Sequence, residues 1–432
     1  MKKALIITYM WPPMEGVGVT RALKFAKYLP LYGWHPVILT VKPDRPMPEC
    51  GNADVVRTDY RDVIGSLRGM MPGRRESSGA AGLSNSSPAS GGQDGRASLL
   101  REIVAMPDDQ IGWYGFAVRD GIKLLETEKI DIIFSTSPPE TAHLIARKLK
   151  KACGIPWVAD LRDLWADDHF RDRPFVKKAA LKFLERKVLA DADSVVTVSK
   201  PWAKRLEMSL GGGKGIVKVV ENGFDDEDFR YGPVVRNEKF TISYTGKLHK
   251  HHQPVTQFFG ALRDLLNEGR IDRRKIEVNF YVFGYDKPDM TGMAKSFGVE
   301  DVVKELGRVS YERSLEIQRA SDALLFVQWR GEGGDGWYSA KIYDYIGSRR
   351  RILALADGGG ITAELIRNTG SGIIADDEPG VKKALLSLYG EFTGHGGAGI
   401  NPDNAATGAL TRKNRTGELA RIFDSICSEG RR

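Results

Sequence analysis

Charged residues follow an apolar segment in the N-terminal half of the chain. Residues 156–160 (PWVAD) have the pattern of a buried β-strand, and Asp160, Arg162 and Asp163 stand at its end or directly after it. In an open α/β sheet the carboxyl ends of the strands face the ligand crevice, so we expect these side chains to line such a crevice. An arginine flanked by two carboxylates can bind a ligand there or can be purely structural, and the sequence leaves both open.

A glycine-containing loop lies near the N-terminus. Gly16 and Gly18 stand between an apolar strand at 4–9 and the helix that follows. Glycines let backbone amides approach a ligand closely, and a helix N-terminus attracts anions; a turn without a ligand is the alternative. Arg21 occupies the third glycine position of a G-x-G-x-x-G fingerprint, and the next strand ends in Thr40 and not in an acid. The loop therefore argues against a nicotinamide dehydrogenase.

Strand and helix patterns alternate along the chain. Apolar runs bounded by turn residues indicate strands, and apolar residues at helical spacing indicate helices. The predicted strands are 4–9, 35–40, 130–136, 156–160, 194–198, 240–244, 278–283, 323–327 and 351–355, and the predicted helices include 20–31, 141–153, 175–190 and 412–427. This order predicts an α/β fold of two doubly wound parallel sheets, each Rossmann-like and built with right-handed crossovers.

The chain length of 432 residues exceeds what one hydrophobic core usually supports, which predicts two domains. The strand–helix pattern restarts after 219–225 (VVENGFD), which we interpret as the hinge. We therefore predict an N-terminal domain at 1–225, a C-terminal domain at 226–410, and a terminal helix and tail at 411–432. Within 72–98, 19 of 27 residues are Gly, Ser, Ala or Pro, which predicts a flexible insertion.

Charge and cysteine content narrow the class of protein. The 64 Lys and Arg residues against 56 Asp and Glu give a net charge of +8, which does not indicate nucleic acid binding but suits anionic substrates or an anionic membrane surface. Cys50, Cys153 and Cys427 have no paired spacing, which favours a reducing cytoplasm over a disulfide framework or a zinc site.

The N-terminal apolar run ends at Pro12 and Pro13, so we interpret it as a strand and not as a signal peptide. No stretch approaches the ~18 apolar residues of a membrane helix.

Several longer stretches carry a combined signal: PPMEGVGVTRALKFAKYLPLYGWHPVILT, STSPPETAHLIARKL with PWVADLRDLWADD, LERKVLADADSVVTVSK, VVENGFDDEDF, ISYTGKL and YSAKIYDYIGSRRRILALA. Together and in this order they resemble the family 4 (GT4-like) glycosyltransferases, and they cover nearly the whole chain apart from the insertion and the tail. The resemblance implies the GT-B fold, in which two Rossmann-like domains face a cleft. It also implies transfer of a sugar from a nucleotide-sugar donor to a saccharide or lipid-linked acceptor, with no metal or cofactor required.

The resemblance implies a donor site in the C-terminal half. Gly246 and Lys247 follow the strand at 240–244, and Lys247 matches the family's phosphate-binding cation. Such a cation is needed because fixed positive charge stabilises the negative charge that grows on a leaving diphosphate. Lys250 is the candidate for the second cation, with His251 and His252 as alternatives.

The stretch 331–345 (GEGGDGWYSAKIYDY) resembles the family's E-x7-E element, a Gly-rich loop that enters a helix. Asp344 matches the second acid, which the resemblance expects to hold the ribose hydroxyls. The first acid would fall at Gly336 and is missing, with Asp335 next to it. Lys341 lies one turn before Asp344 on the same helix face, where the two residues belong to the donor site or form an ordinary surface ion pair.

Our candidates for catalysis are Arg162, Asp163 and Lys247. We expect two further residues, Gly16 and Gly18, to contribute to donor binding. If the reaction inverts the anomeric centre, it requires a general base, and Asp163 is the candidate. If it retains the centre, as the resembled family generally does, the leaving phosphate can take the proton and no protein base is needed.

Two motifs have spacing that can suggest a metal site. Asp191-x-Asp193 follows a predicted helix and precedes a strand, so we interpret it as capping. His249, His251 and His252 lack a nearby cysteine or a patterned carboxylate. We therefore predict no metal site.

Two basic stretches, 147–151 and 171–187, lie in the half expected to bind the acceptor. They are solvated helix faces or contacts to an anionic membrane surface. The function predicted from the whole sequence is a retaining, metal-independent hexosyltransferase in cell-surface polysaccharide or glycan biosynthesis, located in the cytoplasm or peripherally at the inner membrane face. A nucleotide-sugar epimerase of the same fold and a non-catalytic partner subunit are the alternatives, and the missing acid at Gly336 favours the latter.

Overall fold

The computed structural model describes most of the chain, and the predicted insertion at 72–98 and Asp335 lie outside the described residues. The described ranges are 1–14, 16–43, 53–63, 106–168, 173–212, 215–229, 237–284, 287–331, 336–395 and 405–429. The chain divides into two compact units. Unit 1 comprises Met1–Ala166, Arg173–Val196 and Ile422–Arg432, and unit 2 comprises Asp167–Asp172 and Thr197–Arg421.

The N-terminal sheet has seven strands in the order β3-β2-β1-β4-β5-β6-β7. Their bounds are β1 (Lys2–Ile7), β2 (Trp34–Val41), β3 (Asp54–Thr58), β4 (Ile132–Ser137), β5 (Trp157–Leu161), β6 (Ser194–Thr197) and β7 (Val217–Val219). The pairs from β3 through β5 are parallel. The chain reverses its direction of travel across the sheet between β1 and β4, which is where doubly wound sheets bind ligands.

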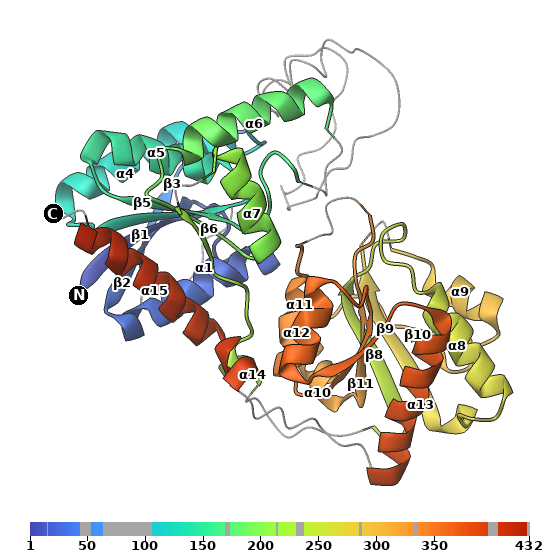
Figure 1. Cartoon of the computed structure of the whole chain (residues 1–432). Helices are drawn as coiled ribbons and strands as arrows, with labels where there is room; N and C mark the ends of the chain where they lie inside the picture. Colours follow the sequence, from blue (N-terminus) through green and yellow to red (C-terminus); the bar gives the residue numbers. More distant parts are fainter. Residues whose placement is uncertain are drawn as a thin grey trace. The chain divides into compact units, whose positions relative to one another are not determined.

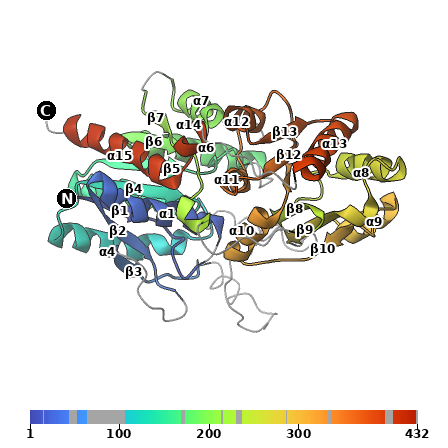
Figure 2. The ribbon, with the colours of Figure 1, turned by 90° about the horizontal axis from the view of Figure 1, so that it is seen from below.

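Helices cover both faces of this sheet (Figures 1 and 2). One face carries α4 (Tyr114–Thr127), α5 (Thr141–Cys153) and α6 (Phe175–Leu189), and the other carries α1 (Val17–Tyr28) and the end of α15 (Arg412–Glu429). The apolar positions predicted for α1 lie inside, where the Phe25 ring meets Phe134 of β4 at 5.8 Å between centroids. Phe423 of α15 packs on the same Phe134 ring at 5.7 Å. The last helix of the chain therefore contributes to the first core.

The second sheet belongs to unit 2 and has six strands in the order β10-β9-β8-β11-β12-β13. Its strands are β8 (Phe240–Lys247), β9 (Ile276–Phe283), β10 (Val303–Glu305), β11 (Ala323–Val327), β12 (Arg351–Leu355) and β13 (Gly372–Ala375), and all neighbours are parallel. Renumbered from β8, this is the 3-2-1-4-5-6 order of a Rossmann sheet. Its switch point lies between β8 and β11.

Two helical layers enclose the second sheet (Figure 1). One layer contains α8 (Thr256–Asn267), α9 (Met290–Phe297) and α13 (Glu378–His395), and the other contains α10 (Tyr311–Ala320), α11 (Ala340–Gly347) and α12 (Ile361–Thr369). Short helices α7 (Lys200–Ser209) and α14 (Ala405–Ala409) complete the described helices of unit 2. None of the helices in the described ranges has the length and apolar character that crossing a membrane requires.

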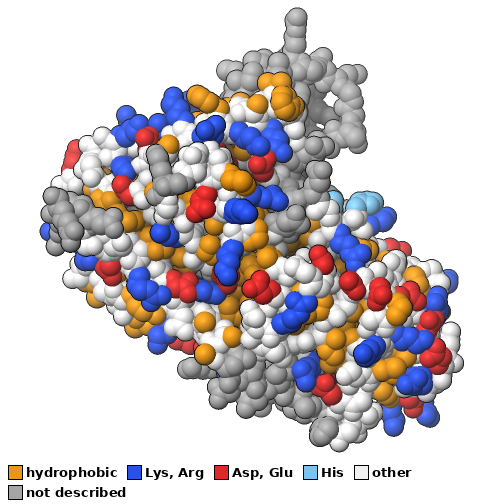
Figure 3. Space-filling model, viewed as in Figure 1, with side chains coloured by type: hydrophobic (Ala, Val, Ile, Leu, Met, Phe, Trp, Pro, Cys, Tyr) orange, Lys and Arg blue, Asp and Glu red, His pale blue; other side chains and the backbone are white. Residues whose placement is uncertain are grey.

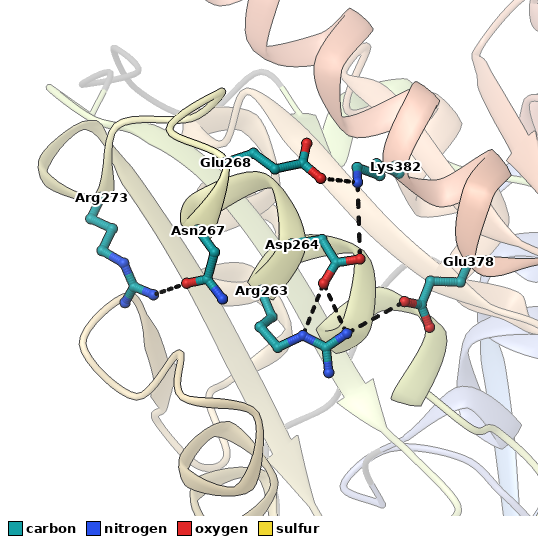
Figure 4. A network of polar contacts seen from close by, with 7 residues as sticks. All are labelled: Arg263, Asp264, Asn267, Glu268, Arg273, Glu378 and Lys382. Carbon is teal, nitrogen blue, oxygen red and sulfur yellow. Dashed lines mark hydrogen bonds and ion pairs between the residues drawn. The ribbon is translucent and has the colours of Figure 1, made fainter.

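A network of charged side chains joins α8 to α13 at the surface of unit 2 (Figure 4). Lys382 of α13 pairs with Glu268, the residue that follows α8, and lies 3.9 Å from Asp264 of α8. Arg263 reaches Asp264 at 2.8 Å and Glu378 at 3.8 Å. These side chains are partly exposed, and exposed pairs of this kind contribute little to stability. The buried apolar side chains beneath them hold the two helices together.

Every predicted strand and helix is present with ends shifted by a few residues, and the prediction of two Rossmann-like parallel sheets is confirmed. The sequence patterns missed the helices α4, α7 and α14 and the strands β3, β7, β10 and β13. β10 has only three residues, and β3 begins with a charged residue and is partly exposed at the sheet edge. Short edge strands carry too few buried positions to produce a clear pattern.

Candidate functional site

The carboxyl end of β8 presents the glycine and the cation that the sequence singled out. Gly246 has a φ of +114°, a conformation that residues with a Cβ rarely adopt, and Lys247 ends the strand with an exposed side chain. A Cβ on Gly246 would lie 3.5 Å from the Cε and Nζ atoms of Lys341. Lys250 lies three residues beyond the strand and is also exposed. Neither Lys247 nor Lys250 forms a side-chain ion pair with the described residues.

Lys341, on the first turn of α11, points at this same strand end. Its ammonium donates hydrogen bonds to the Lys247 carbonyl at 2.8 Å and to the Tyr244 hydroxyl, and it lies 4.3 Å from the centre of the Tyr244 ring. No carboxylate of the described residues pairs with it. Burial without a counterion lowers the pKa of Lys341 to about 7. Lys341 therefore forms no surface ion pair with Asp344, and within the described residues the strand end holds a half-buried cation without a carboxylate partner.

Two buried side chains, one from α11 and one from α10, fix these helices against β8. Tyr345, one turn after Lys341, accepts a hydrogen bond from the Thr245 amide at 3.0 Å. Gln318 of α10 donates to the Thr245 hydroxyl at 3.0 Å. Burial raises the pKa of Tyr345 to about 12, so it is a neutral phenol at physiological pH. Sequence reasoning missed Tyr345, although its i+4 spacing from Lys341 could have placed both residues on one helix face.

Asp344 lies on α11, and its carboxylate lies next to Tyr311 of α10. The Tyr311 hydroxyl, from the first turn of α10, lies 3.3 Å from an Asp344 carboxylate oxygen and 3.4 Å from Asp228. Burial and the two nearby carboxylates raise the pKa of Tyr311, so its hydroxyl stays protonated and can donate. The Tyr311 side chain is 42% exposed. The structure thus adds an accessible tyrosine beside the candidate ribose-binding acid, which the sequence did not indicate.

The histidines after β8 belong to an aromatic cluster. The His252 ring stacks on Trp329 with centroids 4.0 Å apart and planes 7° apart, and His249 meets the edge of the same indole at 5.3 Å. Trp337 contacts Trp329 at 6.0 Å. The Arg330 amide donates to the His252 carbonyl at 2.7 Å, which ties the loop after β8 to the loop after β11. These histidines therefore shape the strand ends on both sides of the switch point.

Gly336, where the resemblance places the missing acid, has a backbone conformation that disfavours any side chain. Its φ is +97°, and a Cβ would come within 2.8 Å of Pro201 and Trp202 in the same unit. Both the torsion and the packing argue that a glutamate at this position would disturb the loop. The local backbone conformation and packing therefore favour a glycine here in place of the acid of the family pattern.

In unit 1, the carboxyl end of β5 is closed by a buried ion pair. Arg21 of α1 donates to both oxygens of Asp160, at 3.0 and 2.7 Å, and both side chains are at most 1% exposed. The Thr136 hydroxyl donates to the same carboxylate at 2.7 Å. Asp160 is therefore satisfied by α1 and β4, and its contacts are structural.

Arg162 is held by backbone carbonyls. Its guanidinium donates to the carbonyls of Ser137 at 2.7 Å, Pro138 at 2.8 Å and Gly18. It thereby joins the loop after β4 to the first turn of α1. The sequence interpretation of an arginine held by two carboxylates is not what the structure contains, because Asp160 pairs with Arg21. Asp163 follows Arg162 directly and is half-buried. Burial lowers the pKa of the Arg162 guanidinium, and the negative charge of Asp163 acts against this shift.

Gly16 and Gly18 of the first loop differ in the space that surrounds their α-carbons. A Cβ on Gly18 would lie 2.1 Å from the Met10 sulfur, so close packing requires this glycine. Gly16 precedes α1 with a φ of +117°, is exposed, and has open space where a Cβ would be. Gly16 is therefore the position where a ligand can approach the backbone.

The remaining candidate motifs have structural contacts. Asp191 pairs with Arg147 and Lys151, and Asp193 accepts a hydrogen bond from the Trp157 amide at 2.7 Å. In the described ranges, no group of three or more His, Cys, Asp or Glu residues is arranged to hold a metal ion.

Comparisons with known proteins agree with this architecture. Residues 16–223 match the family model described as a glycosyl transferase 4-like domain. Among solved structures, the chain is similar to sucrose-phosphate synthase from Thermosynechococcus elongatus, with 11% identity, a TM-score of 0.64, and coverage of 99% of this chain and 100% of that one. It is similar to HepE from Anabaena in complex with UDP and glucose, with 12% identity, a TM-score of 0.61, and coverage of 98% and 100%. No curated protein matches the sequence.

A third solved structure bears on the alternatives. A UDP-N-acetylglucosamine 2-epimerase (putative in its title) from Listeria monocytogenes has 12% identity, a TM-score of 0.55, and coverage of 99% of this chain and 98% of that one. At such identities these likenesses establish the fold alone. The fold is that of the GT-B class, with two Rossmann-like units. Within that fold, residues 16–223 of the chain carry a glycosyl transferase 4-like domain.

Proposed function

We propose that the protein transfers a hexose from a nucleotide-sugar donor to a saccharide or lipid-linked acceptor, with retention at the anomeric carbon and without a metal. The observation that carries the donor half of this proposal is the half-buried ammonium of Lys341, which has no carboxylate partner among the described residues and lies at the strand end beside Gly246. A diphosphate is an anion that can approach such a cation through the space that a glycine leaves open.

The surrounding residues support this proposal. Lys247 and Lys250 add exposed positive charge after β8, and fixed cations stabilise the charge that grows on a departing diphosphate. Asp344, three residues after Lys341, can accept hydrogen bonds from ribose hydroxyls, as the resemblance suggests. HepE, whose structure is titled as a complex with UDP and glucose, shares the fold, which makes a uridine donor the first to test.

The acceptor half of the proposal concerns the residues that follow β5. Asp163 stands at the end of β5, where it can contact an acceptor hydroxyl, whereas Arg162 is engaged with backbone carbonyls and acts as a positioning residue. With retention, the leaving diphosphate accepts the proton of the acceptor hydroxyl, and Asp163 is not needed as a base. We place this activity in the cytoplasm, at the inner face of the membrane, within cell-surface polysaccharide or glycan biosynthesis.

A calorimetric titration of purified full-length protein with UDP-glucose, GDP-mannose and UDP-N-acetylglucosamine tests the donor half. Saturable binding of one of them, weakened in Lys341→Met, supports the proposal, and no binding of any nucleotide sugar contradicts it. Product analysis then separates the activities. Release of free nucleotide that depends on an added saccharide or lipid-linked acceptor indicates a transferase, and release of nucleotide with an epimerised sugar and no acceptor indicates an epimerase. Binding without turnover of any acceptor indicates a non-catalytic subunit.

A further inference from the structure

Tyr244, near the carboxyl end of β8, is a buried tyrosine that contacts Lys341. Its side chain is 1% exposed and belongs to the core beneath α8, α9 and α13, where its ring lies 6.1 Å from that of Phe280. Lys341 comes from α11, which belongs to the other helical layer. The contact between these two side chains therefore joins the two layers of unit 2 at the carboxyl end of β8.

The hydrogen bonds of the Tyr244 hydroxyl run in one consistent direction. Burial raises the pKa of Tyr244 well above its ordinary value, so the phenol keeps its proton. The hydroxyl donates this proton to the Lys247 carbonyl at 2.6 Å. Its oxygen is then left as an acceptor, and the Lys341 ammonium donates to it and to the same carbonyl. Tyr244 thus supplies Lys341 with a side-chain acceptor that carries no charge.

A neutral acceptor fixes an ammonium without cancelling its charge. A carboxylate in the place of the Tyr244 hydroxyl would pair with Lys341 and compete with an incoming anion, whereas a phenol and a carbonyl leave the positive charge available. The centre of the Tyr244 ring lies 4.3 Å from the Lys341 nitrogen, and the face of an aromatic ring attracts a cation. The ring and the hydroxyl of one residue therefore both favour the charged lysine.

The other cations of this strand end have no such support. The side chains of Lys247 and Lys250 are exposed and form no hydrogen bond or ion pair with the described residues. Figure 3 shows histidine and basic side chains next to each other on this surface of unit 2. A lysine that is mobile in the free protein loses conformational entropy when it binds a ligand. Lys341 is held in place before any ligand arrives, which makes its position the more important for affinity.

The remaining titratable side chains near Lys341 do not hold its ammonium. On α11, the Asp344 carboxylate lies next to a tyrosine of α10, and the Tyr345 hydroxyl accepts a hydrogen bond from a backbone amide of β8. On β8, the Lys247 side chain is exposed. Within the described residues, Tyr244 is therefore the side chain that hydrogen-bonds to Lys341.

We propose that Tyr244 is a positioning residue for the donor, whose hydroxyl holds the Lys341 ammonium in its charged form beside Gly246, where a diphosphate would bind. This role rests on the proposed function and adds to it a residue that does not touch the donor. An acceptor for the protons of an ammonium stabilises the charged form. Removal of the hydroxyl should therefore lower the pKa of Lys341 further and weaken donor binding in a way that depends on pH.

Calorimetric titration of full-length Tyr244→Phe with UDP-glucose tests this role. Losing one hydrogen bond to a charged group should lower the proton affinity of the Lys341 amine about tenfold. Since the pKa of Lys341 in the wild type is about 7, most of its side chain is charged at pH 6 and little of it at pH 8. The variant should therefore bind UDP-glucose about twofold more weakly than wild type at pH 6 and about tenfold more weakly at pH 8.

Two tyrosines of α11 provide matched controls. Tyr345→Phe also removes a buried phenol, one that accepts a hydrogen bond from a backbone amide, so it should lower the melting temperature without changing the pH dependence of binding. Tyr343→Phe removes a buried hydroxyl that has no hydrogen-bond partner among the described residues, and it should change neither quantity. If Tyr244→Phe loses affinity by the same factor at both pH values, Tyr244 only supports the fold and the proposal is overturned.

A measurement without ligand separates this proposal from the proposed function. NMR spectroscopy of protein that is isotope-labelled at the lysine ε-carbon follows the titration of Lys341, whose signal is the one missing in Lys341→Met. The midpoint should be lower in Tyr244→Phe than in wild type. Equal midpoints overturn the role of Tyr244 even if nucleotide sugars bind. A lowered midpoint supports the contact even if none of them binds, in which case the proposed function fails instead.

A double variant tests whether the hydroxyl acts through the ammonium. In the Lys341→Met background, Tyr244→Phe should not weaken UDP-glucose binding any further. An additional loss there contradicts the proposal. Should Tyr244→Phe alone fold poorly, the same double variant decides, because it removes the cation together with its acceptor. Recovery of the fold then supports the contact, and continued unfolding contradicts it.

Discussion

The charged residues at the carboxyl ends of the two sheets differ in whether the protein itself supplies their partners. At the first, Asp160 is satisfied by Arg21 and Thr136, and Arg162 donates to backbone carbonyls. At the second, Lys341 is half-buried without a carboxylate partner among the described residues, and Lys247 carries an exposed charge.

This difference separates structural charge from charge that is available to a ligand. Buried charges are normally paired, because desolvation is costly, and a paired charge such as Asp160 fixes the fold around it. A half-buried ammonium whose described neighbours are a backbone carbonyl and one tyrosine side chain is partly desolvated without a countercharge, so it is stabilised when an anion binds. Substitutions at the two edges should therefore affect different quantities.

The largest effect is expected for Arg21→Met, which leaves the Asp160 carboxylate buried without its partner. The free energy of unfolding should fall by about 3–5 kcal/mol, because breaking one side of a buried pair leaves an uncompensated charge. Urea denaturation followed by circular dichroism measures this loss. Lys382→Met, which breaks the exposed pairs of Figure 4, serves as the control and should cost less than about 1 kcal/mol. Equal losses in the two variants would show that Asp160 tolerates the absence of Arg21.

Lys341→Met should lower the affinity for the donor without lowering the stability of the protein. We expect its affinity for UDP-glucose to fall roughly a hundredfold, since a charge-assisted contact to phosphate is lost, while its melting temperature stays the same or rises because a buried unpaired cation is removed. Calorimetry and thermal denaturation measure the two quantities. Lys383→Met, an exposed lysine of α13, should change neither. A lower melting temperature with unchanged affinity would assign Lys341 a structural role.

For Asp344→Asn we expect a smaller loss of affinity for UDP-glucose, about tenfold, because the amide retains the shape but not the charge that strengthens hydrogen bonds to ribose hydroxyls. Asp344→Glu should retain more affinity, since glutamate is the usual residue of the resembled family. Tyr311→Phe provides the companion measurement, because it removes the hydroxyl beside the Asp344 carboxylate. If Asp344→Asn binds like wild type, the donor ribose is held elsewhere.

The smallest effect concerns pH. The free protein holds Lys341 with a pKa of about 7, and a bound diphosphate should raise that pKa, so binding above pH 7 requires proton uptake. Affinity for UDP-glucose should therefore fall about fivefold from pH 7 to pH 8. The same lowered pKa makes the unfolded chain bind more protons between pH 7 and the ordinary lysine value, so the stability of the free protein should rise with pH across that window. Calorimetry in buffers of different ionisation enthalpy measures the proton uptake, which should vanish in Lys341→Met.

Much of the fold could be predicted because local patterns suffice for long buried elements. The helix at 141–153 and the strands at 323–327 and 351–355 have the predicted ends, since apolar periodicity and flanking turn residues such as Gly154 mark them. The pairing of Arg21 with Asp160 could not be predicted, because 139 residues separate the two and only the packing of α1 on the sheet brings them together.

The sequence by itself determined the alternation of strands and helices, the two Rossmann-like sheets, the resemblance to GT4-like glycosyltransferases, and the placement of Gly246, Lys247 and Lys341 near strand and helix ends. Only the tertiary structure decided which charges are compensated. It paired Asp160 with Arg21, anchored Arg162 on carbonyls, compensated basic residues of α5, and left Lys341 without a carboxylate partner in the part of the chain that the structure describes. The physical reason is that periodicity reports on burial along one element, whereas the partner of a charge is set by which elements pack against one another.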